Sequence, residues 1–124
     1  MAKKILVVDD EPDILKVVLY RIKSYGYDVI TATDGEEALE KVRGENPDLI
    51  LLDLRLPGVS GREICERIKN DEEYKHIPVV FLTASEPAGF KEKCKGWGAS
   101  SYIAKPFDSN ELMDVIEQQL KEKN

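Results

Sequence analysis

Chemically useful side chains stand at the ends of four largely apolar segments of this sequence. An acid pair, a lone aspartate, a threonine and a lysine occupy these positions: Asp9-Asp10, Asp53, Thr83 and Lys105. Each could be an ordinary loop or capping residue, because short polar residues are common in turns. In a parallel sheet, however, the strands end at the same edge, so the four groups would meet there. The coincidence of four such endings therefore predicts one site.

Three carboxylates at one edge repel one another unless a proton or a cation lies among them. Two carboxylates about 4–5 Å apart repel by roughly 3–4 kcal/mol at an effective dielectric near 20. Oxygen ligands select a hard ion, and so few of them leave room for water and a phosphate oxygen, which favours Mg²⁺ over Ca²⁺. With a lysine and a hydroxyl added, the set indicates a phosphoryl-transfer site in which a carboxylate can be the nucleophile.

The segments that position these groups alternate between strand and helix patterns. Strand patterns cover Lys4–Val8, Asp28–Thr33, Leu49–Asp53, Pro78–Thr83 and Ser101–Ala104. Helices are expected to open at Glu11-Pro12-Asp13, Asp34–Glu37, Ser60–Glu63 and Asp108–Glu111, and a weakly patterned helix is expected over Glu86–Lys95. Proline in a first turn, and Ser or Asp three residues before Glu, are signals of a helix start.

This alternation predicts an α/β fold, namely a three-layer (βα)5 sandwich with right-handed crossovers around a parallel five-stranded sheet. The first, third and fourth strands are continuous apolar runs, as expected of strands buried on both faces. The second and fifth are more polar and suit the sheet edges. That assignment agrees with the order 2-1-3-4-5 of flavodoxin-like folds, although the order itself comes from that fold class and not from the pattern.

Composition restricts the class of protein. At 124 residues, the chain is long enough for one domain with a single core. The excess of 24 acids over 18 bases gives a net charge of −6, which argues against direct binding to nucleic acid. No apolar run approaches the ~18 residues of a membrane span, and the start lacks a signal-peptide core, so we expect a cytoplasmic protein. Cys65 and Cys94 have no metal-type spacing and are expected to be reduced core or half-buried residues.

Four motifs at the strand ends span most of the chain: Val7-Val8-Asp9-Asp10-Glu11, Leu51–Gly61, Val80–Ala84 and Gly98–Pro106. In sequence, order and spacing they closely resemble the receiver domain of two-component response regulators. The resemblance covers essentially the whole chain, residues 1–124, and no output domain is expected in it. It implies a phosphorelay signalling switch and not an enzyme that turns over an external substrate.

The resemblance also assigns roles around a metal ion. It implies that Mg²⁺ is ligated directly by Asp10, by Asp53 and by the backbone carbonyl of Arg55. Asp9 would act largely through metal-bound water. Asp53 would accept a phosphoryl group from a phosphohistidine on a sensor histidine kinase or on a histidine phosphotransfer protein.

Further roles concern the phosphoryl group and its readout. By resemblance, Lys105 pairs with the phosphoryl group and Asp53, and Thr83 bonds a phosphoryl oxygen. Coupling between Thr83 and Tyr102 would then shift the face made by the fourth helix, fifth strand and fifth helix, where a downstream protein would bind. The Lys105-Pro106 bond resembles the family's cis peptide, which is uncommon at X-Pro bonds in general.

Two residues depart from the common family pattern. Arg55, two residues after the acceptor, is a large cation where the family often carries an uncharged side chain, which bears on the rate of dephosphorylation. Trp97 is bulkier than the small residue common just before Gly98-Ala99, which bears on the partner surface.

Two alternative functions share parts of this pattern. An aspartyl-phosphate phosphatase would need a general acid or base beside its nucleophile, whereas Leu54 and Arg55 follow Asp53. A flavodoxin-like FMN carrier needs a loop that attracts phosphate, whereas Asp9-Asp10-Glu11 repels anions. His76 lies near the start of the fourth strand, about 20 Å from Thr83 if the chain is extended, so we expect the donor histidine on another protein.

Overall fold

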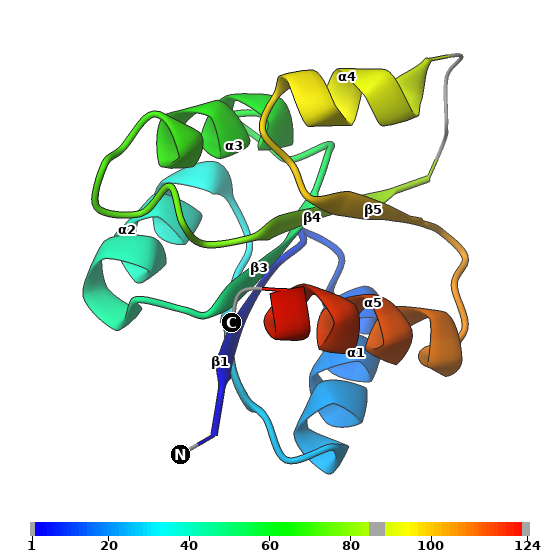
Figure 1. Ribbon diagram of the computed structural model, residues 1–124. Helices are drawn as coiled ribbons and strands as arrows, with labels where there is room; N and C mark the ends of the chain where they lie inside the picture. The colour runs from blue at the N-terminus through cyan, green and yellow to red at the C-terminus, as the bar shows by residue number, and fades with distance from the viewer. Residues whose placement is uncertain (1, 85–88, 123–124) are drawn as a thin grey trace.

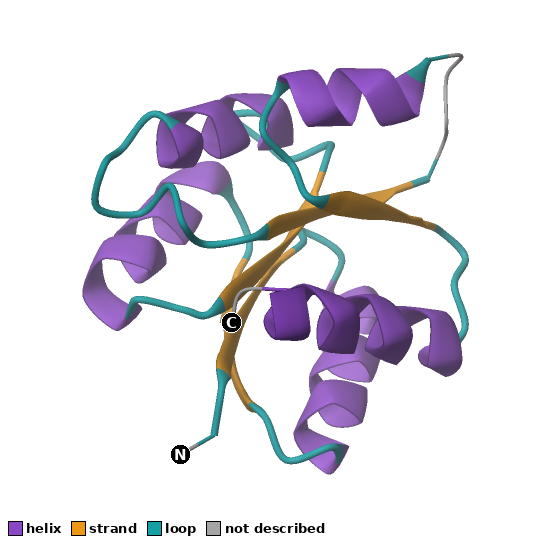
Figure 2. Ribbon diagram, in the orientation of Figure 1, coloured by secondary structure: helices purple, strands orange, loops and turns teal. Residues whose placement is uncertain are grey.

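The computed structural model describes residues 2–84 and 89–122, and within them strands and helices alternate along the chain (Figures 1 and 2). The elements are β1 (Lys4–Val8), α1 (Pro12–Ser24), β2 (Asp28–Ala32), α2 (Gly35–Glu45), β3 (Leu49–Asp53), α3 (Gly61–Lys69), β4 (Val79–Thr83), α4 (Phe90–Gly96), β5 (Ser101–Ala104) and α5 (Ser109–Glu122). This order confirms the predicted alternation.

The strands form one parallel sheet in the order β2-β1-β3-β4-β5. The sheet confirms the expected flavodoxin-like topology, with the apolar strands β1, β3 and β4 inside and the more polar β2 and β5 at the edges. Helices α1 and α5 cover one face, and α2, α3 and α4 cover the other (Figure 1). The protein is therefore the three-layer sandwich that the sequence predicts.

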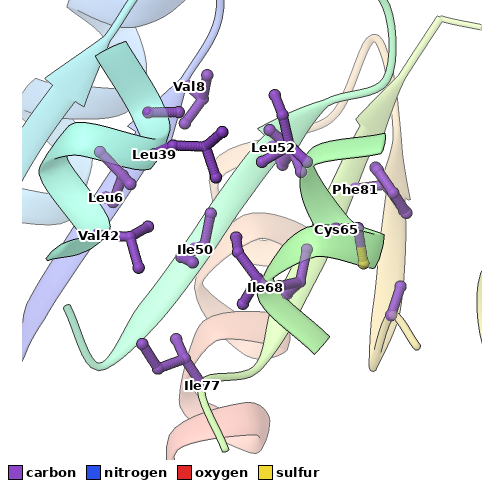
Figure 3. Packing of buried hydrophobic residues seen from close by; sticks show 14 of the residues in the cluster. Leu6, Val8, Leu39, Val42, Ile50, Leu52, Cys65, Ile68, Ile77 and Phe81 are labelled. Carbon is purple, nitrogen blue, oxygen red and sulfur yellow. The ribbon is translucent and has the colours of Figure 1, made fainter. Parts of the chain in front are cut away.

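The core is divided by the sheet into two clusters of buried side chains. Alternate residues of a strand point to opposite faces, so Leu6 and Val8 join the cluster beneath α2, α3 and α4, whereas Ile5 and Val7 join the cluster beneath α1 and α5. Figure 3 shows the first cluster. Because both faces are covered, the central strands need apolar residues at every position, which explains their unbroken apolar runs.

Local signals place most helix starts correctly. The side chains of Asp34, Ser60 and Asp108 accept hydrogen bonds from the backbone N–H groups of Glu37, Glu63 and Glu111. These caps satisfy N–H groups that have no partner within the helix. The helix expected over 86–95 is observed as Phe90–Gly96, while its predicted start at 86–88 lies outside the described residues.

Three further expectations concern single features. Cys65 and Cys94 are buried and form no disulfide. The Lys105-Pro106 peptide bond is cis, as the resemblance implies. Among the described residues, no helix is both long enough and apolar enough to cross a membrane.

Candidate functional site

The carboxyl ends of four strands bring the predicted residues to one edge of the sheet. Asp53 and Thr83 are the last residues of β3 and β4, and Asp9 and Lys105 directly follow β1 and β5. The ladder continues past the strand ends, since the Lys105 N–H donates to the Thr83 carbonyl at 2.6 Å. Parallel pairing in register therefore positions these side chains, although they are far apart in the sequence.

The Lys105 ammonium is the centre of this edge. Its Nζ lies 2.9 Å from Asp9 Oδ2 and 3.4 Å from both Asp53 Oδ2 and Glu11 Oε1. The side chains of Asp9, Asp53 and Lys105 are 0%, 8% and 10% exposed, so little water reaches their ion pairs. A buried charge needs such partners, because desolvation without pairing is costly.

Two short loops hold the buried carboxylates in place. Asp9 Oδ1 accepts a hydrogen bond from the Glu11 N–H at 2.9 Å, and Asp53 Oδ1 accepts one from the Arg55 N–H at 3.1 Å. Both contacts join an aspartate to the backbone two residues later, a local arrangement that Asp favours in turns. In each carboxylate the other oxygen, Oδ2, contacts Lys105.

Opposing effects of burial and of neighbouring charges set the pKa values of Asp53 and Lys105. Burial raises the pKa of Asp53, and the neighbouring Asp9 raises it further, outweighing the Arg55 N–H and the Lys105 ammonium, which lower it. Burial lowers the pKa of Lys105, but the hydrogen bond to Asp9 and the charges of Asp53, Asp9 and Glu11 together raise it above its ordinary value. The lysine is therefore firmly cationic at neutral pH, while one ammonium leaves the acids incompletely neutralised.

The donor set fits a hard divalent cation. Asp9, Asp10, Glu11 and Asp53 each offer a carboxylate oxygen, and these oxygens all lie within 4.8 Å of one another. Oxygen-only ligands and partial solvent exposure suit Mg²⁺, which keeps several waters. Glu11 was not among the ligands predicted from the sequence, although the acidic run Asp9-Asp10-Glu11 was its visible signal. The expected role of the Arg55 carbonyl remains a prediction.

Thr83 and Tyr102 occupy neighbouring strands. Thr83 is buried and pairs in register with Ala104, whereas Tyr102 pairs with Phe81, two residues further from the site edge. The half-buried Tyr102 ring meets Phe90 edge-on, with the ring centroids 5.1 Å apart. The structure thus gives Tyr102 a partner on α4, and its expected coupling to Thr83 stays a prediction.

His76 does not belong to the site. It is exposed and lies in the segment before β4, whereas the acids gather where the strands end. Its position agrees with the expectation that it is a loop residue.

Comparisons with known proteins agree on one family. The family profile described as the response regulator receiver domain matches residues 5–117. The alkaline phosphatase synthesis transcriptional regulatory protein PhoP of Bacillus subtilis is 45% identical over 112 residues, which are 90% of this chain and 46% of that protein. The chain thus spans about half the length of this relative.

Solved structures give the same result. A receiver domain protein from Methanospirillum hungatei aligns with a TM-score of 0.91 at 28% identity, covering 99% of this chain and 97% of that one. A putative response regulator from Chloroflexus aurantiacus aligns with a TM-score of 0.92 at 31% identity, covering 98% and 99%. The chemotaxis response regulator CheY4 of Vibrio cholerae aligns with a TM-score of 0.90 at 31% identity, covering 96% and 99%.

Proposed function

This chain belongs to the response regulator receiver family of two-component signalling, and we propose that its Asp53 is the residue that accepts the phosphoryl group. The observation that carries the proposal is the position of Lys105 Nζ, which contacts Asp53 Oδ2 and Asp9 Oδ2 at a buried edge. Three acids contact that ammonium, and Asp10 offers a fourth carboxylate oxygen within 4.8 Å of theirs. An anionic phosphoryl group joined to Asp53 would gain from a lysine already in place and from a metal ion among the acids.

Transfer requires one bond exchange. A carboxylate oxygen of Asp53 attacks phosphorus, the P–N bond to the donor histidine breaks, and its electron pair stays on that nitrogen. The product is an acyl phosphate on Asp53. Asp10, Asp53 and the Arg55 carbonyl would hold a Mg²⁺ ion directly, and Asp9 would hold it through water. The ion would supply positive charge beside the oxygens of the transferring phosphoryl group.

The remaining residues orient and stabilise the group. Lys105 is anchored by Asp9 and can follow the charge that moves from the Asp53 carboxylate to its phosphoryl oxygens. Thr83, buried at the end of the neighbouring strand β4, would donate its hydroxyl to one of these oxygens. Preorganised donors of this kind stabilise developing charge because little reorganisation is needed during the transfer.

The donor and the target are proteins in this proposal. A sensor histidine kinase or a histidine phosphotransfer protein, located in the cytoplasm with this chain, provides the phosphohistidine. A hollow of about 250 Å³ beside Lys105, lined by Ile14, Val17, Pro106 and Phe107 among others, offers apolar surface for a protein donor next to the acceptor. The target binds the face of α4, β5 and α5, and the domain acts as a switch without turning over an external substrate.

Labelling by acetyl phosphate tests the acceptor. With Mg²⁺, the intact protein should gain one hydroxylamine-labile phosphoryl group by mass spectrometry, and Asp53→Asn should gain none. Asp28→Asn is the matched control, because Asp28 is an exposed acid at the start of β2, away from the site edge. Equal labelling of Asp53→Asn and the wild type would overturn the assignment.

A further inference from the structure

One face of α3 contacts the turn that ends α4. Arg62, Cys65 and Lys69 are spaced three and four residues apart, so they lie on the same side of the helix. All three reach Trp97 or Gly98, which follow the last residue of α4. The two helices are neighbours on the same face of the sheet (Figure 1).

Two of these contacts involve Trp97. The guanidinium carbon of Arg62 lies 5.4 Å from the centroid of the indole ring, a cation–π arrangement. The Cys65 thiol donates to the Trp97 carbonyl, with 3.4 Å between sulfur and oxygen. Trp97 is also the C-cap of α4, because its N–H donates to the carbonyls of Lys93 and Cys94. Helix α3 therefore holds the residue that closes α4.

The third contact lies one residue further along. Gly98 has a φ of +92°, and a Cβ there would come within 2.6 Å of Lys69 Cγ, so the lysine stem lies directly against the glycine backbone. The Lys69 ammonium donates to the carbonyls of Lys75 and Ile77. These bonds fix the lysine, and the lysine in turn limits movement of the turn after α4.

The indole ring extends the connection into the core. It meets Phe81 of β4 at a centroid distance of 5.8 Å and Phe90 at 6.2 Å, edge-on in both cases. At the other end of α4, the N-cap is Gly89 with no side-chain cap, and the Phe90 ring reaches Tyr102 of the edge strand. Among the described residues, the C-terminal end of α4 is thus tied to α3 and β4, and its N-terminal end contacts the edge strand β5 through Phe90.

Helix α3 is itself fixed to the site edge, next to Asp53. Its first residue, Gly61, donates its N–H to the Leu54 carbonyl at 3.2 Å. A Cβ at Gly61 would overlap the carbonyl oxygen of Asp53, so the helix begins in direct contact with the backbone of that residue. The anchor of α4 is therefore built on an element with little freedom to move.

We propose that Trp97 is the fixed end of α4, held by the Arg62, Cys65 and Lys69 face of α3. Movement of α4 is then a rotation about Trp97 that displaces mainly its N-terminal end, where Phe90 meets Tyr102. The trigger of this movement rests on the proposed phosphorylation of Asp53, whereas the anchor itself is a property of the unmodified protein. An experiment can therefore contradict the anchor without contradicting the proposed phosphorylation of Asp53, and the reverse also holds.

Hydrogen exchange of the unmodified protein tests the anchor alone. Arg62→Met removes the cation above the indole and keeps a long side chain. Exchange at the Trp97 and Gly98 amides should accelerate about two- to fivefold, the factor corresponding to a surface cation–π contact. Arg67→Met is the matched control, since Arg67 lies on the same helix and its ion pair with Glu63 corresponds to that of Arg62 with Glu66. Equal exchange at these two amides in both variants would overturn the anchor.

Beryllofluoride with Mg²⁺, an analogue of the phosphoryl group, tests the rotation by NMR. In the wild type, the backbone resonances of Phe90–Glu92 should shift more than those of Trp97 and Gly98. In Arg62→Met the shifts should spread to Trp97 and Gly98, and in Arg67→Met they should not. Equal shifts at both ends in the wild type would overturn the rotation. If the wild type shows no shift at any residue although Asp53 is labelled by acetyl phosphate, the rotation is overturned. If Asp53 is not labelled either, the proposed phosphorylation fails, and the exchange experiment still decides the anchor.

Discussion

The site edge and the aromatic junction, made by Phe81, Phe90, Trp97 and Tyr102, both include residues of β4 and its neighbourhood but are held together differently. At the edge, Lys105 binds three carboxylates at 2.9–3.4 Å, and like charges crowd around it. In the junction, aromatic rings meet edge-on at 5.1–6.2 Å, and Phe81 and Phe90 are buried. The edge has the charges that chemistry requires, whereas the junction has the apolar contacts that stability requires.

This difference implies that the two regions respond to different changes. Aromatic side chains contribute large buried areas to stability, whereas at the edge the attraction of each acid to Lys105 is offset by desolvation and by repulsion among the acids. Substitutions in the junction should therefore lower the free energy of unfolding while phosphorylation per folded molecule persists. Conservative substitutions at the edge should lower phosphorylation per folded molecule while the free energy of unfolding changes little.

The largest effect is expected from Phe81→Ala. Phe81 is fully buried and packs against Trp97, so its truncation should lower the free energy of unfolding by about 3–5 kcal/mol. Urea denaturation measures this loss, and labelling by acetyl phosphate under native conditions should still reach the wild-type level in the folded fraction. A loss below about 1 kcal/mol would remove the junction from its structural role.

The sequence predicts the edge better than the junction for a physical reason. Asp9, Asp53, Thr83 and Lys105 stand where strands end, and parallel pairing alone brings strand ends together. The stacking of Arg62 on Trp97 depends on rotamers and on the distance between α3 and α4, neither of which follows from periodicity. The sequence marked Trp97 only as unusually bulky, and the structure provides its partners.

The next effect is a pH dependence beside the junction. Burial raises the pKa of Cys65 from 9.0 to about 11, mainly because the thiolate would be desolvated. A raised folded-state pKa gives stability that is complete below pH 9 and is lost as the pH rises through about 11. Two pKa units correspond to about 2–3 kcal/mol. Between these pH values, wild-type stability should therefore fall more steeply than that of Cys65→Ala.

Chemical denaturation at several pH values measures the two slopes. Tyrosine titrations and Cys94 are common to both proteins, and so are the lysine titrations except that of Lys69, whose pKa burial lowers and the Cys65 thiolate raises. Parallel slopes for the wild type and Cys65→Ala would show that the Cys65 thiol does not titrate differently in the folded and unfolded chains.

At the edge, Asp9→Asn should change metal binding more than stability. Asp9 is fully buried, bonded to Lys105 and within 4.8 Å of the other acids. A group that acts through metal-bound water typically contributes 10–100-fold to affinity. Calorimetric titration should therefore show Mg²⁺ affinity reduced by about that factor, with Asp28→Asn as the unaffected control. An unchanged affinity would place Asp9 outside the metal site.

The edge also shows where sequence reasoning stops short. Glu11 follows the predicted ligands Asp9 and Asp10, and its carboxylate reaches both Lys105 and the acidic cluster. The direction of this side chain depends on the turn into α1. Its N–H is held by Asp9 Oδ1 at 2.9 Å, which fixes the chain as it enters that helix. A run of acids indicates a charged loop, and only the backbone course shows how many of them face the site.

The smallest effect is expected from Arg55→Ala, and it tests whether a side chain beside the edge influences its chemistry. The Arg55 N–H binds Asp53 Oδ1, while its side chain is exposed. A guanidinium reaching over the crevice would pair with phosphoryl oxygens and shield the acyl phosphate from water. Surface ion pairs are worth at most about 1 kcal/mol, so the phosphoryl half-life should shorten by no more than about fivefold.

Mg²⁺ affinity should stay within a few-fold of the wild type in Arg55→Ala, because only the backbone of this residue is expected at the metal. The half-life is followed by intact mass after removal of acetyl phosphate, with Arg43→Ala, an exposed arginine in the last turn of α2, as the control. An unchanged half-life would mean that the guanidinium does not reach the phosphoryl group. The buried charges of Asp9, Asp53 and Lys105 would then determine the chemistry of the edge without help from this exposed side chain.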